Sequence, residues 1–253
     1  MRKTVLITGA TSGIGEASAI KFAEAACRLI ITGRRKDRLD DLTEHLVQEY
    51  GIEVLPLCFD VREKKEVQKN LGNLPAEWNK VDILINNAGL AVGLSHIDDG
   101  EIDDWDRMID TNVKGLLYVT RAIAPGMVKR GSGHIINIAS IAGKEVYENG
   151  AVYCASKHAV DALSRGMRID MLRHGIKVTN IAPGLTETEF SLVRFKGDTG
   201  KAKVPYMGVE PLSGTDIAAV IYFAATQPAH VNLNDIVITP TAQASGIYIH
   251  RKQ

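Results

Sequence analysis

Short apolar runs rich in β-branched residues alternate with longer segments of helical apolar spacing along this chain. The runs that predict β-strands are residues 4–8, 29–32, 53–58, 83–85, 134–138, 177–181 and 235–239. Helical segments between them include residues 14–26, 105–129, 152–174 and 215–226. Strands joined by helices return in parallel, so the pattern predicts an α/β fold: a doubly wound parallel sheet of about seven strands with helices on both faces. Ligands of such sheets bind at the carboxyl ends of the strands.

Length and charge narrow the class of protein. The 253 residues are 45% hydrophobic, enough for one sizeable core, so residues 1–253 are predicted to form a single domain. The 30 basic residues balance the 30 acidic residues, and this balance predicts neither a nucleic-acid partner nor a membrane partner. Residues 185–210 lack clear periodicity and contain three glycines and a proline, which predicts a mobile substrate loop or lid.

The cysteines and histidines give no metal-binding pattern. Cys27, Cys58 and Cys154 form no CxxC pair, and the histidines show no HxH or HxxxH spacing. A disulfide framework or a metal site is therefore not predicted. Without a recognisable signal peptide or a bilayer-length apolar stretch, the chain is predicted to be cytoplasmic.

A glycine-rich turn follows the first predicted strand, with the sequence Thr8-Gly9-Ala10-Thr11-Ser12-Gly13-Ile14-Gly15. Glycine lets the backbone approach a pyrophosphate, which the N–H groups and the positive dipole end of the next helix attract. An ordinary βα turn is the alternative, but strand, glycines and helix coincide here. The turn thus predicts a Rossmann-type dinucleotide site made by Gly9, Thr11, Ser12, Gly13, Ile14 and Gly15.

The second predicted strand ends where the adenosine ribose of a dinucleotide would lie. A carboxylate there would pair with the 2′-hydroxyl of NAD, but this chain has Gly33-Arg34-Arg35 instead. A guanidinium can bind a 2′-phosphate through two hydrogen bonds. We therefore expect NADP as the cofactor, held by Arg34 and secondarily by Arg35; a solvated basic turn continuing to Lys36 and Arg38 is the alternative.

The next two predicted strands also end in candidate cofactor residues. Asp60 and Val61 follow the third strand, where the Asp60 carboxylate could accept from the adenine amino group or serve as a helix N-cap. Asn87, Ala88 and Gly89 follow the fourth strand and supply small side chains where the ribose and nicotinamide would cross the sheet.

A tyrosine and a lysine are spaced for proton transfer. Tyr153 and Lys157 lie at i and i+4 of a predicted helix, so their side chains share one face. An adjacent ammonium and a positive nicotinamide would favour the phenolate and make Tyr153 a usable acid or base. Ser140 ends the fifth predicted strand and could stabilise charge on a substrate oxygen or merely cap a helix.

These features together resemble the short-chain dehydrogenase/reductase family over essentially the whole chain. The resemblance is carried by the turn at 9–15, Asn86-Asn87-Ala88-Gly89, Asn112, Ser140, Tyr153-x-x-x-Lys157 and Pro183-Gly184. It implies that Tyr153 is the general acid/base, that Ser140 polarises the substrate carbonyl, and that Lys157 lowers the pKa of Tyr153 and binds the nicotinamide ribose. It also implies that Asn112 holds a water in a proton relay. Pro183 and Gly184 resemble the turn beside the carboxamide, with Thr186 and Thr188 expected nearby.

A narrower resemblance concerns the substrate. Segments 183–185, 188–190, 193–198, 228–232 and 240–243 are similar to those of NADP-dependent 3-hydroxy acid dehydrogenases acting on serine, allo-threonine or 3-hydroxypropionate, and of sulfoacetaldehyde reductases. Both kinds of substrate are small anions, which implies a cation near the nicotinamide. We expect Arg194 in this role, with Gln243 as a second contact, Tyr147 at the pocket wall, and Lys196 or Lys201 as substitutes for Arg194.

Several alternatives stay open at this point. Between Ser140 and Tyr153 the chain departs from the amino-acid-oxidising members of the family: Glu145 and Glu148 could bind a substrate ammonium, pair with Lys144 or face water. A broad carbonyl reductase for neutral ketones or dicarbonyls is the rival enzyme, and a nucleotide-sensing binding protein is the rival without turnover. The predicted helix at 152–174 carries Ala155, Ala159, Ala162 and Leu163, which could pack within one subunit or allow close helix contact between subunits. The family resemblance implies tetramers, so a homotetramer is expected.

Overall fold

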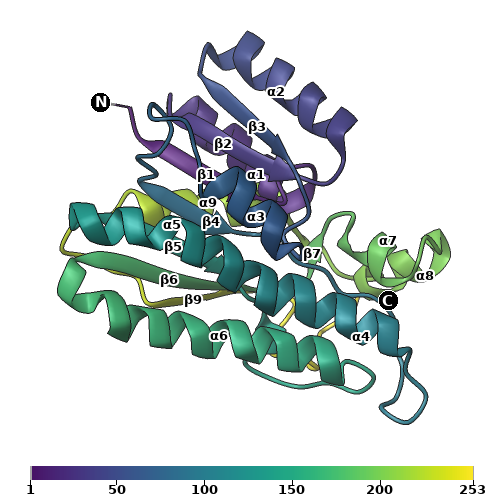
Figure 1. The fold of residues 1–253 in the computed structure, drawn as a ribbon. Helices are drawn as coiled ribbons and strands as arrows, with labels where there is room; N and C mark the ends of the chain where they lie inside the picture. Colours follow the sequence, from purple (N-terminus) through teal and green to yellow (C-terminus); the bar gives the residue numbers. More distant parts are fainter. Residues whose placement is uncertain (1, 253) are drawn as a thin grey trace.

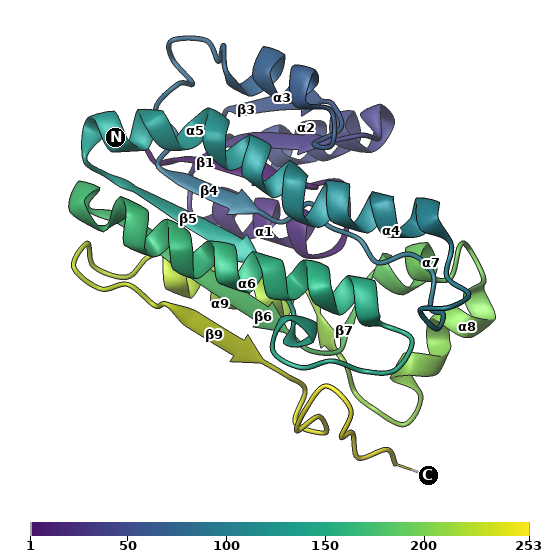
Figure 2. The ribbon, with the colours of Figure 1, turned by 60° about the horizontal axis from the view of Figure 1, so that its bottom comes forward.

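A computed structural model describes residues 2–252 as one α/β domain built on a seven-stranded sheet (Figures 1 and 2). The strands are β1 (Thr4–Thr8), β2 (Arg28–Gly33), β3 (Val54–Cys58), β4 (Ile83–Asn86), β5 (Gly133–Ile138), β6 (Ile176–Pro183) and β9 (Asp235–Ile238). Their order is β3-β2-β1-β4-β5-β6-β9, and all neighbours pair in parallel. The doubly wound sheet expected from the sequence is confirmed.

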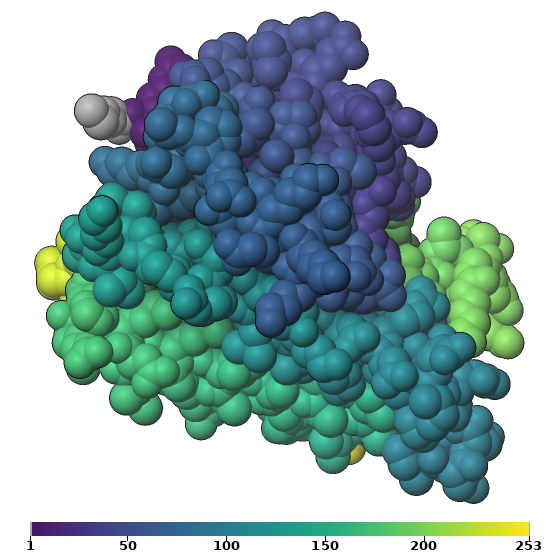
Figure 3. All heavy atoms as spheres, in the orientation of Figure 1, coloured from purple at the N-terminus to yellow at the C-terminus, as the bar shows by residue number. Residues whose placement is uncertain are grey.

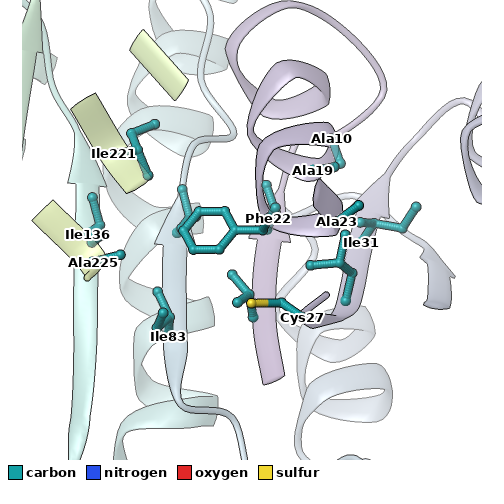
Figure 4. Packing of buried hydrophobic residues seen from close by; sticks show 14 of the residues in the cluster. Ala10, Ala19, Phe22, Ala23, Cys27, Ile31, Ile83, Ile136, Ile221 and Ala225 are labelled. Carbon is teal, nitrogen blue, oxygen red and sulfur yellow. The ribbon is translucent and has the colours of Figure 1, made fainter. Parts of the chain in front are cut away.

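Helices cover both faces of this sheet. They are α1 (Gly13–Glu24), α2 (Lys36–Tyr50), α3 (Lys64–Leu71), α4 (Ile102–Ile109), α5 (Leu116–Arg130), α6 (Ala151–Met171) and α9 (Gly214–Ala225). One core layer joins α1, α2 and α9 to the sheet, and the other joins α3, α5 and α6. Figure 4 shows part of the first layer, in which Phe22 of α1 packs with Ile31 and Ile83 of the sheet and Ile221 of α9. The central strands are apolar on both faces because helices bury both faces.

The helical segment predicted at residues 105–129 consists of three parts. Helix α4 begins three residues earlier, at Ile102, and a π-helix at Asp110–Gly115 joins it to α5. A π-turn inserts an extra residue into the helical repeat and often marks a functional site. No helix in residues 2–252 is long and apolar enough to cross a bilayer.

The predicted lid, residues 185–210, has more structure than its sequence suggested. It contains β7 (Thr186–Glu187), α7 (Phe190–Arg194) and α8 (Thr199–Lys203), and β7 pairs with β8 (Leu212–Ser213) outside the main sheet. Helices of five residues are too short to show an apolar period, so the sequence could not reveal them. Figure 3 shows this segment as the light green lobe that projects from the body of the molecule.

The sheet order reverses between β1 and β4, because β2 and β3 extend to one side and β5, β6 and β9 to the other. In open α/β sheets the ligand crevice lies outside the carboxyl ends of the strands at this switch point. The fold therefore directs attention to the residues that follow β1, β2, β4, β5 and β6.

Candidate active site

A cavity of about 490 Å³ opens at the carboxyl ends of these strands and runs under the lid. It is lined by Gly9, Thr11, Ser12, Gly13, Ile14, Arg34, Arg35, Asp60, Val61, Asn87, Ala88, Gly89, Ser140, Tyr147, Tyr153, Lys157, Pro183, Gly184, Thr186, Thr188, Arg194 and Gln243, among others. Two of the predicted site residues, Gly15 and Asn112, lie behind this wall. Residues far apart in the sequence thus meet in one cleft.

The glycine turn is shaped by close backbone contacts. Gly9 has a φ of +66°, and a Cβ on it would lie 2.9 Å from the Cα of Ala88. A Cβ on Gly15 would lie 2.2 Å from the carbonyl oxygen of Gly9, so this glycine is needed for the turn to pack on itself. The Asn87 side-chain amide donates to the carbonyl oxygens of Thr8 and Gly9 at 2.9 and 3.1 Å and ties the turn to β4. The start of α1 is left open to an anion, because the N-cap Ser12 makes no capping hydrogen bond with its side chain.

The two arginines after β2 have different surroundings. Arg35 donates to the carbonyl oxygen of Thr11 at 3.0 Å and to Glu189 of the lid at 2.8 Å. The Arg34 side chain is 52% exposed, and among residues 2–252 its guanidinium forms an ion pair only with Asp60, at 3.7 Å. The Arg34 guanidinium is therefore the freer of the two to bind a phosphate, and Arg35 joins the lid to the glycine turn.

Asp60 is engaged by a neighbouring arginine. Its carboxylate accepts from Arg62 Nε at 3.0 Å and Nη2 at 2.7 Å and also from the Arg62 backbone N–H. Burial raises the pKa of Asp60, but these hydrogen bonds and the charge of Arg34 outweigh it and leave the pKa below its usual value. Asp60 is not the N-cap of α3, a position that Glu63 occupies.

Tyr153 and Lys157 lie one turn apart on α6, and both are buried. Lys157 Nζ lies 6.0 Å from the centroid of the Tyr153 ring and donates to the Ile138 carbonyl oxygen at 2.9 Å. Burial lowers the pKa of Lys157 to about 8. Burial also raises the pKa of Tyr153, whereas the positive charge of Arg194 and the Ser140 hydroxyl oppose this rise. The positive charge that opposes the rise in this structure belongs to Arg194, and the expected role of Lys157 in lowering the Tyr153 pKa stays a prediction.

Ser140 and Asn112 both have structural partners. The Ser140 hydroxyl accepts from the Ala142 N–H at 3.1 Å, as a cap of the short helix Ile141–Gly143, and donates to the Pro183 carbonyl oxygen at 3.3 Å. The Asn112 side chain, in the π-helix, bonds both backbone groups of Leu90 at 2.8 Å and the Ser156 hydroxyl at 2.9 Å. These hydrogen bonds occupy the Asn112 side chain. Its expected role in a water relay would use its backbone groups and stays a prediction.

The substrate end of the cleft contains a cation among aromatic rings. The guanidinium carbon of Arg194 lies 5.1 Å from the centroid of the Tyr153 ring, 5.5 Å from that of Tyr147 and 5.8 Å from that of Phe190. One of its nitrogens donates to the Tyr147 hydroxyl at 2.5 Å. Stacking on rings holds a guanidinium in one plane and excludes water from its faces.

Comparison with known proteins gives the family of this chain. Residues 3–197 match the short chain dehydrogenase family. The chain belongs to this family. An NADP-dependent 3-hydroxy acid dehydrogenase of Escherichia coli K12 is 45% identical over 98% of this chain and 99% of the relative. Sulfoacetaldehyde reductase 2 of Chromohalobacter salexigens is 44% identical over 96% of each chain.

A solved structure has the same fold as this short-chain dehydrogenase. The closed form of serine dehydrogenase complexed with NADP⁺ superimposes with a TM-score of 0.91 at 44% identity, covering 98% of this chain and all of that one. The family and the fold predicted from the sequence are therefore confirmed, and the rival interpretation as a binding protein without turnover has no support among these relatives.

The second predicted substrate contact of the dehydrogenase, Gln243, forms hydrogen bonds within the protein. Gln243 is buried in the cavity wall, where its side chain accepts from the Leu185 N–H at 2.8 Å and donates to the Ser245 carbonyl oxygen at 3.1 Å. These bonds hold the turn after β6 against the C-terminal segment. Its contact with substrate stays a prediction.

The charged residues named as alternatives lie outside the cavity wall. Lys196 pairs with Asp104 at 2.7 Å and Lys201 with Asp198 at 3.6 Å. Glu145 accepts from the Gly246 N–H at 2.7 Å, and the exposed Glu148 lies 3.7 Å from His96. None of the four lysine and glutamate side chains lines the cavity.

Sequence reasoning missed several residues of this dehydrogenase. Phe190 and Tyr206 line the cavity from the lid, and the Phe190 ring lies 5.6 Å from that of Tyr153. Aromatic residues within a polar, aperiodic segment were the available signal. Within residues 2–252 no cluster of His, Cys, Asp and Glu side chains could hold a metal ion.

Proposed function

We propose that this dehydrogenase transfers a hydride between NADP(H) and a short alcohol or aldehyde that carries a carboxylate or sulfonate. The observation that carries the proposal is the Arg194 guanidinium stacked beside the Tyr153 ring in the same cavity. A cation at this distance can bind an anionic group while the reacting carbon remains near the phenol. The 3-hydroxy acid, sulfoacetaldehyde and serine named for the relatives are all compatible with such a contact.

The cleft fits NADP at three points. The glycine turn leaves no side chain between the backbone and a pyrophosphate, and the unbonded Ser12 hydroxyl stands at the start of α1. Arg34 presents a half-exposed guanidinium after β2, where a 2′-phosphate would lie. Lys157 and Tyr153 line the cavity at the other end, where the nicotinamide ribose would be held.

The residues at the reacting end divide the chemistry between them. NADPH, when bound, supplies the hydride to the carbonyl carbon. Tyr153 donates the proton to the carbonyl oxygen, and Ser140 donates a hydrogen bond that stabilises the charge developing there. The nearby charge of Arg194 lowers the free energy of the phenolate left behind. In the reverse direction Tyr153 accepts the proton from the alcohol.

Initial rates across a substrate panel test this proposal. The panel pairs anions with neutral analogues: 3-hydroxypropionate with 1,3-propanediol, and sulfoacetaldehyde with glycolaldehyde, and adds serine, allo-threonine and methylglyoxal. We expect a lower KM for the anions, and we expect Arg194→Ala to raise KM for the anions selectively by about 10- to 100-fold, the value of a charge-assisted hydrogen bond. An equal effect on neutral substrates would favour a broad carbonyl reductase instead.

Two further properties are part of the proposal. The outward residues Ala155 and Ala162 of α6 are exposed in the single chain, which supports a homotetramer built on helix contacts. Cys27, Cys58 and Cys154 are all free thiols, as is usual in a reducing compartment, which supports a cytoplasmic location.

A further inference from the structure

The position of Arg194 depends on a contact outside the cavity. Arg194 is the last residue of α7, a helix of five residues in the lid. A helix this short has little stability of its own. Its guanidinium nevertheless has to stay beside the Tyr153 ring, so other groups must fix the end of α7 relative to the catalytic helix.

A buried carboxylate lies where such a support is needed. Asp104 is in the first turn of α4, and its side chain is only 8% exposed. Its Oδ2 lies 2.7 Å from Lys196 Nζ, and its Oδ1 lies 3.7 Å from an Arg107 nitrogen. Lys196 follows Arg194 by two residues, so this ion pair joins α4 to the end of α7.

The backbone at this junction is arranged around the same carboxylate. The Gly93 N–H donates to the Arg194 carbonyl oxygen at 3.0 Å. Gly93 has a φ of +72°, and a Cβ on it would lie 2.9 Å from Asp104 Oδ2. Lys196 itself has a φ of +52°, a backbone conformation that residues other than glycine rarely adopt. This strained backbone coincides with the ion pair that the Lys196 side chain makes with Asp104.

The same helix packs against the catalytic residues. Met108 of α4 belongs to the apolar cluster that contains Tyr153 and Cys154, and Trp105 of α4 packs against that cluster, as Phe190 does. Asp104 is therefore held in a fixed relation to α6, which carries Tyr153. Helix α4 thus contacts both the apolar cluster around Tyr153 and Lys196, which lies two residues after Arg194.

We propose that Asp104, acting through Lys196 and beside the Gly93–Arg194 backbone bond, is a positioning residue that holds the Arg194 guanidinium at the substrate anion. The proposal rests on the function proposed above. Neither Asp104 nor Lys196 touches the reacting atoms. Their loss should therefore weaken binding of the anion more than it slows the proton step, to which the Arg194 charge also contributes.

The test compares Asp104→Asn, Lys196→Gln, Lys196→Arg and Arg194→Ala with the unaltered enzyme. KM and kcat are measured for 3-hydroxypropionate, 1,3-propanediol, sulfoacetaldehyde and glycolaldehyde, together with KM for NADP(H). We expect Lys196→Gln and Asp104→Asn to raise KM for the anions roughly three- to tenfold, a part of the arginine's own contribution. KM for the neutral compounds and for NADP(H) should stay unchanged, and kcat should change less than KM.

Control variants separate positioning from general damage. Lys196→Arg keeps the cation and should retain a low KM. Lys201→Gln removes another lid lysine, which is 71% exposed and pairs with Asp198, and should have no effect. Lys196→Gln in the Arg194→Ala background should raise KM no further, because the group that it positions is gone. Lys196 is 54% exposed, so its variants test the proposal even if Asp104→Asn is unstable.

The possible failures are distinguishable. If Arg194→Ala raises KM for the anions and Lys196→Gln does not, the positioning role is wrong and the proposed function stands. If Lys196→Gln raises KM for anions and neutral compounds equally, the pair serves the lid in general and the positioning role is again wrong. If Arg194→Ala is without effect, or neither anion is turned over, the proposed function fails and this inference fails with it.

Discussion

At the scale of single residues, the proposed chemistry depends on a phenol that is difficult to ionise. Burial raises the pKa of Tyr153, and the Arg194 cation and the Ser140 hydroxyl oppose this rise. Lys157 is also buried, with a pKa lowered to about 8, so it holds its proton less firmly than a surface lysine. A buried tyrosine and a buried lysine with shifted pKa values in one cleft are typical of a proton-transfer site.

Tyr153→Phe should remove the proton donor and leave the cavity shape nearly unchanged. We expect kcat to fall by at least about 10²–10⁴-fold, the usual contribution of general acid–base catalysis. The Kd for NADPH, measured by fluorescence titration, should stay within about twofold, because the ring still packs against Phe190. Near-normal turnover would exclude Tyr153 as the acid.

Arg34→Ala should weaken NADPH selectively. The lost charge-assisted hydrogen bonds correspond to about 1.5–3 kcal/mol, or roughly a 10- to 150-fold higher Kd for NADPH with little change for NADH. Lys36→Ala is the matched control, because Lys36 continues the basic run but pairs with Asp40 away from the cavity. If Arg34→Ala leaves the preference for NADPH over NADH unchanged, the contact with the 2′-phosphate would be assigned to Arg35.

At the scale of elements, the strand pair β5 and β6 contains a buried histidine. The His134 ring bonds the Thr179 hydroxyl across the pair at 2.8 Å. Burial, reinforced by the charge of Lys177, lowers the pKa of His134 from 6.5 to about 3. Between these values the unfolded chain binds a proton at this residue that the folded chain does not.

Stability should therefore depend on pH through His134. Because the unfolded state binds more protons between pH 3 and 6.5, the free energy of unfolding contributed by this residue decreases as the pH falls through that window. The expected result is that His134→Gln loses less stability than the unaltered protein between pH 6.5 and 4, measured by urea denaturation at each pH. If both proteins lose the same free energy of unfolding as the pH falls, the acid sensitivity would be assigned to carboxylates alone.

At the scale of the whole molecule, the assembly state is the main expectation left to measurement. Sedimentation velocity should give a species of about four times the 27.5 kDa chain mass. Ala162→Glu, which places a charge on the outward face of α6, should shift that species to smaller assemblies. A monomer in the unaltered protein, or a tetramer that survives Ala162→Glu unchanged, would contradict an interface on this face.

Local patterns in the sequence determined the sheet and the glycine turn and placed Tyr153 and Lys157 on one face of a helix, whereas the roles of Ser140 and Asn112 were implied by the family resemblance. Strand ends agree with the predicted runs to within two residues, because β-branched apolar runs and glycine turns act over a few neighbouring positions. The spacing of Tyr153 and Lys157 likewise needs only one helical turn. The sequence could predict these features because each depends on residues only a few positions apart.

Only the tertiary structure decided which charged groups meet. Glu189 binds Arg35 across 154 positions, Lys196 binds Asp104 across a junction of two elements, and Arg194 stacks on Tyr153. The sequence favoured Arg194 but left Lys196 and Lys201 as substitutes, because an exposed cation has no local preference for a partner. Folding selects among them by burial and distance, since both depend on packing between elements that no local pattern encodes.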